Sequence, residues 1–228
     1  MNGSKAPEDP DPHDGRSDSP GRGHRWAPGT VDTPMGRAKS ALRKSIAALS
    51  CSLDKDRVME ESRSICRRMT HERWWPCSGA VMVYIPAANE PDIAEFIHAC
   101  VGARIDVVAP RIDWEARRLD PALIADPATD FTPSRHGIRE PGSWCPPAAL
   151  RSIDVVLVPG VAFGERGERL GRGGGFYDRF LARGELRALR VGIAFDFQVV
   201  PDIPADAHDV RMDAVVTPSR VIRATGRA

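Results

Sequence analysis

The residues with the clearest chemical potential lie in one loop, residues 159–183, whose sequence is PGVAFGERGERLGRGGGFYDRFLAR. Six of the twelve residues from 164 to 175 are glycine, and Arg166, Arg169 and Arg172 are interleaved with them. Glycine permits unusual dihedral angles and close approach, so consecutive backbone N–H groups can converge on an anion. Arginine adds bidentate recognition of phosphate. The loop is therefore typical of a polyphosphate-binding site.

A helix is predicted to begin near Phe176, directly after the glycines, and its N-terminus would add partial positive charge to the site. Asp178 falls in the first turn of that helix, where its carboxylate could hold a magnesium ion shared with the phosphate. The simpler interpretation of Asp178 is a charge that stabilises the helix N-terminus.

The loop does not match two familiar nucleotide motifs. It lacks the GK[ST] of a Walker A loop, and the spacing Gly171-x-Gly173-x-x-Phe176 departs from the dinucleotide fingerprint. Two other interpretations stay open from these residues alone. One is a purely structural glycine-rich turn, and the other is RNA binding by the RGG triplet at residues 172–174, a property of disordered tails.

The segments that would position this loop alternate between helical and strand patterns. Periodic apolar residues predict helices over residues 36–49, 54–70 and 93–101. Apolar, β-branched runs predict strands over residues 79–85, 105–109, 153–158, 190–195 and 214–217. Such alternation indicates an α/β fold with a mostly parallel, doubly wound sheet. The loop then follows a buried strand, at the edge where such sheets bind ligands.

Residues 1–34 differ from the rest, with six prolines, five glycines and five apolar residues. This segment cannot bury enough surface to offset its ordering entropy, so we predict a disordered tail before a single domain over residues 35–228. It has no apolar core of a secretory signal and is rich in acidic residues, which favours a cytoplasmic location. Residues 111–152 show little periodicity, and long irregular stretches are often functional.

Composition excludes several classes of protein. With 42% hydrophobic and 28% charged residues the 228-residue chain is not wholly disordered, and 32 Lys and Arg against 31 Asp and Glu disfavour general binding to nucleic acid. The longest apolar run, residues 80–88, is too short to span a membrane. The cysteines form no CxxC pair, and we expect all five to be reduced, small buried side chains: Cys51, Cys66, Cys77, Cys100 and Cys145.

The segment RLGRGGGFYD at residues 169–178, preceded by VPGVAF, resembles the signature of 5-formyltetrahydrofolate cyclo-ligases, also called methenyltetrahydrofolate synthetases. Four further segments match in family order: KSALR at 39–43, YIPAANEPD at 84–92, GIREP at 137–141 and HDVRMD at 208–213. Phe176 stands where many members have Tyr, and Gly174 where some have Lys. The resemblance implies a three-layer α/β/α fold with a Rossmann-like, NagB-like sheet.

The resemblance also implies the reaction, an ATP- and magnesium-dependent cyclisation of 5-formyltetrahydrofolate to 5,10-methenyltetrahydrofolate. The γ-phosphoryl group of ATP would move to the formyl oxygen, N10 would attack the formyl carbon, and ADP and phosphate would be released. Phosphoryl transfer needs positioning and charge neutralisation more than a side-chain nucleophile, which suits this set of residues. The implied partners are small molecules only, with no nucleic acid and no membrane, and the implied state is a monomer.

Residue roles follow from the same resemblance. Catalysis is expected from Lys39, Arg172 and Asp178. The expected ATP-binding residues are Lys39, Arg43, Arg169, Leu170, Gly171, Arg172, Gly173, Gly174, Gly175, Phe176 and Tyr177. The expected folate-binding residues are Arg43, Ile85, Glu90 and Tyr177. Magnesium would be held by Asp178 and Asp209.

Plainer interpretations exist for several of these residues. Lys39 and Arg43 could form a solvated helix face, Glu90 could cap the following helix, and Tyr177 could simply pack against a strand. At the level of function, the alternatives are a non-catalytic nucleotide- or RNA-binding module and an ATP-dependent ligase or kinase for a different small acid. The Glu90 segment and the aspartate pair favour the cyclo-ligase.

Overall fold

The computed structural model describes residues 1, 33–75, 78–87, 89–134, 139–206 and 209–224. The expected disordered tail therefore lies almost entirely outside the described residues. The first helix, α1 (Pro34–Cys51), begins where the sequence predicts folded structure to begin. Thr33 caps it, because its side chain accepts a hydrogen bond from the backbone N–H of Gly36 at 3.0 Å.

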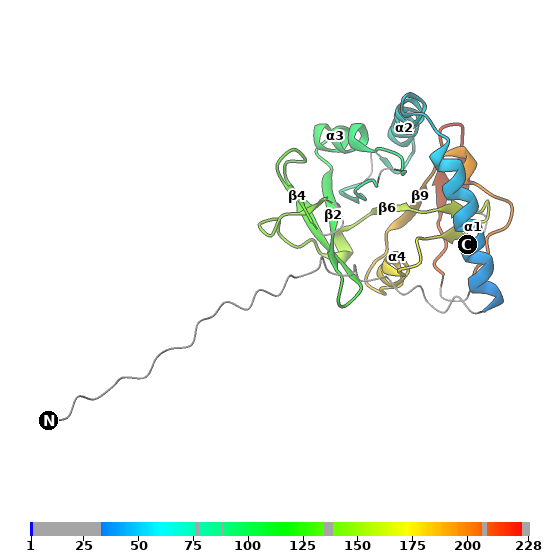
Figure 1. Ribbon diagram of the computed structural model, residues 1–228. Helices are drawn as coiled ribbons and strands as arrows, with labels where there is room; N and C mark the ends of the chain where they lie inside the picture. Colours follow the sequence, from blue (N-terminus) through cyan, green and yellow to red (C-terminus); the bar gives the residue numbers. More distant parts are fainter. Residues whose placement is uncertain (2–32, 76–77, 88, 135–138, 207–208, 225–228) are drawn as a thin grey trace.

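A seven-stranded sheet in the order β11-β10-β9-β6-β1-β2-β3 forms the centre of the fold (Figure 1). Its strands are β1 (Ala80–Met82), β2 (Asp106–Asp113), β3 (Arg118–Ile124), β6 (Val155–Pro159), β9 (Leu189–Ile193), β10 (Ala214–Val216) and β11 (Val221–Arg223). The five inner strands pair in parallel, and the two edge strands pair antiparallel. The predicted mostly parallel α/β sheet is confirmed.

The strand order fixes where a ligand can enter. Along the chain the parallel strands are β1, β2, β6, β9 and β10, and in the sheet β1 lies between β2 and β6. The connections therefore run in opposite directions from the boundary between β1 and β6, which is a topological switch point. In such sheets, ligands bind in a crevice beyond the carboxyl ends of the strands at this point. The crevice is therefore expected between the Glu90 segment, which follows β1, and the glycine-rich loop, which follows β6.

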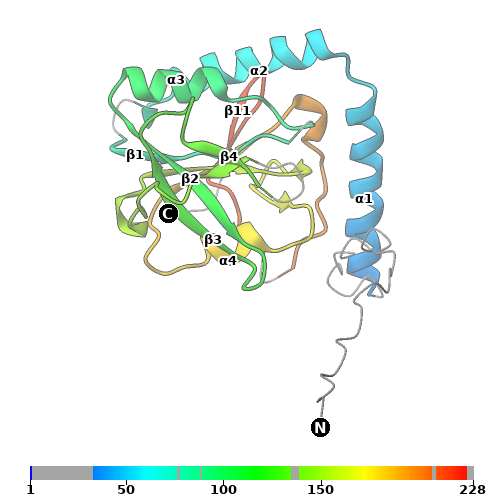
Figure 2. The same ribbon diagram turned by 60° about the vertical axis from the view of Figure 1, so that its left-hand side comes forward.

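Helices cover both faces of the sheet. α2 (Lys55–Thr70) and α3 (Ala94–Gly102) lie along one face, as Figure 2 shows, and bury Ile65 and Phe96 against Val81 of β1. On the other face the short α4 (Phe176–Leu181) buries Phe180 against Met82. The alternation of strand side chains between two separate clusters produces the three layers predicted from the sequence.

α1 stands apart from these layers and packs on a hairpin that follows β6. The hairpin consists of β7 (Ala162–Phe163) and β8 (Arg169–Leu170), and Ile46 of α1 is buried against Ala162 and Leu170. Leu49, three residues beyond Ile46, lies outside this cluster and is half exposed. α1 is thus held beside the start of the glycine-rich loop.

Residues 111–152 are more regular than predicted. β2 continues to Asp113 and forms a hairpin with β3, from Val107 opposite Ile124 to Asp113 opposite Arg118. The segment also contains β4 (Phe131–Pro133), β5 (Arg139–Pro141) and the 3₁₀ turn Leu150–Ser152; a second such turn, Asp196–Gln198, follows β9. Pro121 within β3 hides the strand pattern in the sequence, and an edge strand tolerates it.

Three described cysteines are buried as predicted, and one is not. Cys66, Cys100 and Cys145 are buried, whereas Cys51 at the end of α1 is exposed, so that prediction was wrong for Cys51. Cys77 lies outside the described residues. Burial raises the pKa of the Cys66 thiol to about 11 and that of Cys100 to about 12, which keeps both protonated. Within the described ranges, no helix is long and apolar enough to cross a membrane.

Candidate active site

The glycine-rich loop runs from the end of β8 into α4 and needs glycine at two positions. Gly173 has a φ of 101° and Gly175 a φ of 65°, in the left-handed region that side chains with a Cβ disfavour. Gly175 is the N-cap of α4, and the helix begins at Phe176, as the sequence predicts. Arg172 and Asp178 therefore lie on one short segment of the chain, which turns at these two glycines.

The root of this loop is a buried ion pair between Arg169 and Asp178. The Arg169 side chain is only 4% exposed, and its Nη2 donates to Asp178 Oδ1 at 2.8 Å while Nη1 donates to the Pro159 carbonyl at 3.2 Å. Its guanidinium also lies over the ring of Tyr177, 5.7 Å from the centroid. Arg169 was expected to bind phosphate, but here its hydrogen bonds go to the protein and hold Asp178 in place.

The tip of the loop carries a second ion pair, which crosses the crevice between β1 and β6. Arg172 Nη2 and Nε donate to Glu90 Oε1 at 2.8 and 3.1 Å. Glu90 Oε2 accepts from the Ala87 backbone N–H at 3.0 Å, so this carboxylate also closes its own turn. The Glu90 side chain is 9% exposed and that of Arg172 is 61% exposed.

The contacts of Glu90 exclude one plain interpretation of it. The N-cap of α3 is Ile93, so Glu90 does not cap the following helix. The carboxylate faces the glycine-rich loop instead, from the segment that leaves the carboxyl end of β1. Glu90, an expected folate-binding residue, and Arg172, an expected ATP-binding residue, are therefore joined before any ligand is considered.

α1 brings two cations to the same loop. Arg43 Nε donates to the Gly171 carbonyl at 2.8 Å, and Lys39 Nζ donates to Asp206 at 2.9 Å and to Asp209 at 2.6 Å. The Lys39 side chain is 13% exposed. The solvated-face interpretation is therefore wrong for both, since each side chain turns toward the segments that the resemblance pairs with it.

Local electrostatics keep these two cations charged. Burial lowers the pKa of Lys39, but its hydrogen bonds to Asp209 and Asp206 and their charges outweigh this, and the pKa lies above its usual value. Burial lowers the pKa of Arg43, and the charge of Asp209 opposes that shift. Asp209 is thus the acidic residue whose charge acts on both cations, and Lys39 ties α1 to Asp206 and Asp209.

The two expected magnesium ligands are each bound to a cation in the structure. Asp178 is held by Arg169 and Asp209 by Lys39, and the described part of the chain contains no group of three or more His, Cys, Asp or Glu side chains able to hold a metal. Each carboxylate keeps one oxygen that makes no hydrogen bond to a described residue. Their side chains are 25% and 20% exposed, so ligands can reach them.

Three of the remaining expected site residues, Tyr177, Ile85 and Leu170, are partly or fully buried in the core clusters. Tyr177 is partly buried between the two core clusters, and burial together with the charge of Glu90 raises its pKa well above the usual value although Arg169 opposes this. Ile85 is half-buried beside the same cluster. Leu170 is buried under α1, so only its backbone is available to a ligand.

The β2–β3 hairpin holds the far side of the loop through residues that the sequence did not single out. Arg179 donates to the carbonyls of Gly174 and Arg117, each at 2.8 Å, and lies over the ring of Phe176. Trp114 meets Phe176 edge-on, with ring centroids 5.5 Å apart. No periodicity or motif marks Trp114, because it lies in a hairpin that sequence patterns missed. The hairpin clamps α4 and thereby the loop.

Comparisons with known proteins agree with these features. The model of the 5-formyltetrahydrofolate cyclo-ligase family matches residues 35–218. The chain is 34% identical over 145 residues to a 5-formyltetrahydrofolate cyclo-ligase of Mycolicibacterium smegmatis, covering 62% of this chain and 75% of the relative. It is 45% identical to a mitochondrial 5-formyltetrahydrofolate cyclo-ligase of Arabidopsis thaliana, covering 83% and 76%.

A solved structure shares the fold. The solution structure of a 5,10-methenyltetrahydrofolate synthetase from Aquifex aeolicus superposes with a TM-score of 0.73 at 29% identity, covering 83% of this chain and 95% of that one. The matched family region, residues 35–218, contains every residue of the crevice described above. The region thus includes the glycine-rich loop, the Glu90 segment and the α1 cations.

Proposed function

The chain belongs to the 5-formyltetrahydrofolate cyclo-ligase family, and on that premise we propose how its own residues divide the work. The protein is an enzyme that cyclises 5-formyltetrahydrofolate to 5,10-methenyltetrahydrofolate at the expense of ATP. The proposal concerns the route of the reaction and the residues that carry it. It rests on one observation above all: Arg43 and Glu90, from opposite sides, both contact the glycine-rich loop.

The chemical difficulty is a formamide carbon that is a poor electrophile. We propose that its oxygen attacks the γ-phosphorus of ATP, and that the bond to ADP breaks. N10 then attacks the activated carbon and loses its proton, and the carbon–oxygen bond breaks to release phosphate. Neither step requires a protein nucleophile, so the enzyme contributes position and charge. The residues around the crevice are suited to that task.

Phosphate binding is assigned to the tip of the loop and to α1. Arg172 has the exposure and the fork of donors that a phosphate requires, and Gly173 and Gly175 allow backbone N–H groups to approach closely. Lys39 would reach a phosphate by breaking its hydrogen bond to Asp206. Arg43 supports the loop through its hydrogen bond to the Gly171 carbonyl. Arg169 is a positioning residue, because its guanidinium is buried and bound to Asp178.

Folate binding is assigned to the opposite wall of the crevice. Glu90 would accept hydrogen bonds from the amino and amide edge of the pterin, and Ile85 and Tyr177 would supply apolar contact. This assignment gives the ion pair between Glu90 and Arg172 a role. Each partner is held by the other until ligands arrive, so a pterin that takes Glu90 releases Arg172 for phosphate. Binding of folate should then favour binding of ATP, and the coupling must be reciprocal.

The carboxylates of the site suit magnesium in their chemistry. Magnesium is usually held by one or two carboxylates together with substrate phosphates and water, and Asp178 and Asp209 each keep one oxygen outside the described hydrogen bonds. Asp178 and Asp209 would hold the ion, which when bound would neutralise charge on the phosphates. Arg169 and Lys39 balance the two carboxylates in the absence of that charge. These ion pairs hold the two carboxylates in position.

The cytoplasmic location and the monomeric state expected from the sequence remain proposals. One relative bears the name of a mitochondrial enzyme, so the family is not confined to one compartment.

One assay tests the proposed function against its alternatives. Purified protein is mixed with 5-formyltetrahydrofolate, ATP and magnesium, and the methenyl product is followed by its absorbance while ADP is measured separately. We expect both products in equal amounts, and neither without folate. Nucleotide binding without ADP would indicate a binding module. ADP formation that ignores folate but responds to another acid would indicate a different ligase or kinase.

A further inference from the structure

Two buried polar side chains lie where the crevice begins, and neither has been assigned to a ligand. Gln198 ends the 3₁₀ turn that follows β9, and Tyr84 lies two residues beyond the end of β1; each is only 2% exposed. A buried amide or hydroxyl needs hydrogen-bond partners, because leaving it unpaired in the interior is costly. Both side chains find such partners in backbone carbonyl groups of the segments that leave β6 and β1.

Gln198 holds the segment that leaves β6. Its Nε2 donates to the carbonyls of Gly160 and Val161 at 3.0 and 3.1 Å. Its Oε1 accepts from the Phe195 N–H at 2.8 Å. Gly160 and Val161 are the first two residues after β6, and Phe195 lies just beyond β9. One side chain therefore joins the carboxyl ends of two neighbouring strands and satisfies three backbone groups.

The segment that Gln198 holds also supports Arg169, at the root of the glycine-rich loop. The Pro159 carbonyl accepts from Arg169 Nη1 at 3.2 Å. Gly160 has no room for a side chain, because a Cβ there would lie 2.6 Å from the ring of Phe163 and 3.3 Å from Cγ of Arg169. A shift of residues 160–161 would thus be passed to Arg169, which in turn donates to Asp178 at 2.8 Å.

Tyr84 holds the segment that leaves β1. Its hydroxyl donates to the Pro91 carbonyl at 2.6 Å, and Pro91 directly follows Glu90. Burial, together with the charge of Glu90, raises the pKa of Tyr84 well above its usual value, so the hydroxyl keeps its proton and remains a donor. The next residue is also fixed, since the Asp92 N–H donates to Ser62 Oγ of α2 at 3.0 Å. The backbone beside the Glu90 carboxylate is thus held from two directions.

We propose that Gln198 and Tyr84 are positioning residues, one for each wall of the crevice. Gln198 fixes the phosphate-binding wall through Arg169, and Tyr84 fixes the folate-binding wall through Glu90. The inference rests on the proposed function for the assignment of the two walls. Its physical basis is that removing the side-chain donor leaves buried carbonyl groups unpaired, which favours a shift toward another donor. A misplacement of about 1 Å can cost about hundredfold in rate, so small shifts are sufficient.

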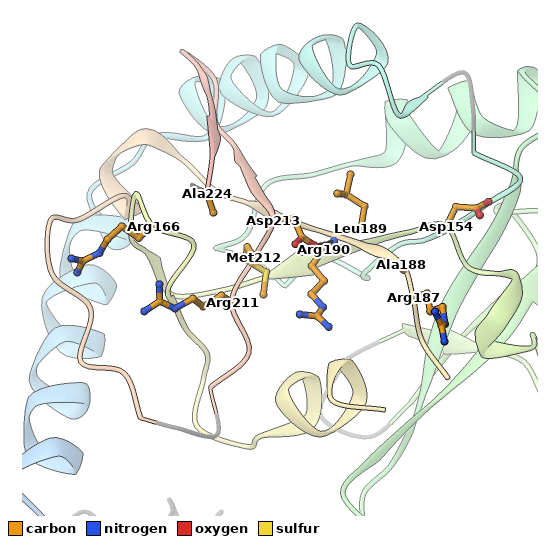
Figure 3. A pocket seen from close by; sticks show the side chains of 10 residues that line it. All are labelled: Asp154, Arg166, Arg187, Ala188, Leu189, Arg190, Arg211, Met212, Asp213 and Ala224. Carbon is orange, nitrogen blue, oxygen red and sulfur yellow. Dashed lines mark hydrogen bonds between the residues drawn. The ribbon is translucent and has the colours of Figure 1, made fainter. Parts of the chain in front are cut away.

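A hollow at the other end of the sheet supplies one control for the test. It has a volume of about 720 Å³ and lies beside Asp154, Leu189 and Asp213, at the starts of β6, β9 and β10 (Figure 3). None of the residues assigned to ATP, folate or magnesium lines it. Arg187 lines this hollow and is exposed, so Arg187→Gln tests whether ATP is bound there instead of in the crevice.

The test measures binding of ATP with magnesium and of 5-formyltetrahydrofolate, each alone, to the full chain by calorimetry. The variants are Tyr84→Phe, Gln198→Met, which removes three hydrogen bonds at similar side-chain length, and Gln198→Glu, a milder change that can still accept from the Phe195 N–H. Thr217→Val is the matched control, because the Thr217 hydroxyl is fully buried and bonds the backbone of Arg220, between β10 and β11. Circular dichroism checks that each variant is folded.

We expect Gln198→Met to weaken ATP about tenfold and folate less than about twofold. Tyr84→Phe should weaken folate about tenfold without weakening ATP. Thr217→Val and Arg187→Gln should change neither ligand by more than about twofold. A merely structural role would lower stability and leave the two affinities unchanged, or change them together.

The inference is overturned if either variant weakens both ligands equally, if it weakens the ligand of its own wall less than about twofold, or if Arg187→Gln weakens ATP as much as Gln198→Met. If Gln198→Met does not fold, Gln198→Glu decides by the same ratio of affinities. The original chain separates this inference from the proposed function. If it forms the methenyl product but the variants show no such split, only the positioning inference fails. If the split is observed but no methenyl product forms, the proposed reaction fails and the positioning stands. If it binds neither ligand, both fail.

Discussion

Arg169 and Arg172 lie three residues apart in the same glycine-rich loop, but their surroundings differ. At the root of the loop, Arg169 is 4% exposed and is bound to Asp178 and to a backbone carbonyl. At the tip, Arg172 is 61% exposed, and its side chain donates to Glu90 within the described part of the chain. A motif therefore specifies that two arginines are present, and burial decides which one can meet a ligand.

The largest effect that tests this comparison is expected at the root, from Asp178→Asn. Removal of the charge takes away the proposed magnesium ligand, and turnover should fall about hundredfold or more, as it does when one preorganised electrostatic contact is lost. The amide oxygen can still accept from Arg169, so circular dichroism should be unchanged. Initial rates of methenyl formation measure the loss.

Asp120→Asn is the matched control for that variant. Asp120 forms a surface ion pair with Arg118 on β3, outside the crevice. It should retain full turnover. If Asp178→Asn were as active as Asp120→Asn, or if the unaltered enzyme worked at full rate in a chelator, the assignment of magnesium to Asp178 would be wrong.

The next prediction compares how much Arg169, at the root of the loop, and Arg172, at its tip, contribute to the free energy of unfolding. Arg169→Gln leaves a partly buried carboxylate without its cation, and breaking such a pair is expected to lower the free energy of unfolding by about 3 kcal/mol. Arg172→Gln removes an exposed cation from the largely buried Glu90, which keeps the backbone N–H of Ala87 as a donor, and should lower it by less, about 1 kcal/mol. Urea unfolding of the two variants beside the original chain measures both. Equal losses would contradict the distinction drawn between the two arginines.

A third effect, about tenfold, concerns ligand binding at the tip. Arg172→Gln should weaken ATP more than folate, since a charge-assisted contact to phosphate is lost, and Glu90→Gln should weaken folate more than ATP. Because Glu90→Gln also releases Arg172, ATP should bind this variant in the absence of folate at least as tightly as it binds the original chain. Calorimetry with each ligand alone and then with both gives the coupling. Weaker ATP binding to Glu90→Gln would show that the pair does not restrain Arg172.

Sequence patterns were sufficient for the parts of the fold that have strong periodicity. The strands β1, β6 and β9 and the helices α2 and α3 carry continuous or periodic apolar residues, and each was predicted close to its observed place. The β2–β3 hairpin was not, because Pro121 and the polar end of β2 obscure the alternation. Trp114, which packs on Phe176 from that hairpin, was missed for the same reason, and so was the hydrogen bond from Arg179 of α4 to the Arg117 carbonyl of the hairpin.

The residue types were sufficient to predict which residues belong to the site. They did not predict which of these residues contact each other. The loop, Lys39, Arg43 and Glu90 do converge, but the partners inside the cluster depend on distances that no spacing encodes. Nothing in the motif indicates that Arg169 turns inward to Asp178 while Arg172 turns outward to Glu90. Those choices depend on the β7–β8 hairpin and on α1. The two pack together through Ile46, Ala162 and Leu170, which come from distant parts of the chain.

The smallest effect is expected far from both root and tip, at the start of α1. A chain shortened to begin at Met35 loses Thr33, whose hydroxyl accepts from the Gly36 N–H, and such caps are worth about 1 kcal/mol. A chain shortened to begin at Thr33 keeps that cap. We expect the first to melt a few degrees lower than the second, since about 1 kcal/mol corresponds to such a shift in a domain of this size. Both should retain full turnover, because Lys39 and Arg43 are held by Asp209 and Gly171 in the part that remains. A rise in the KM for folate with unchanged melting, in both shortened chains, would instead mean that residues before Thr33 contribute to the crevice.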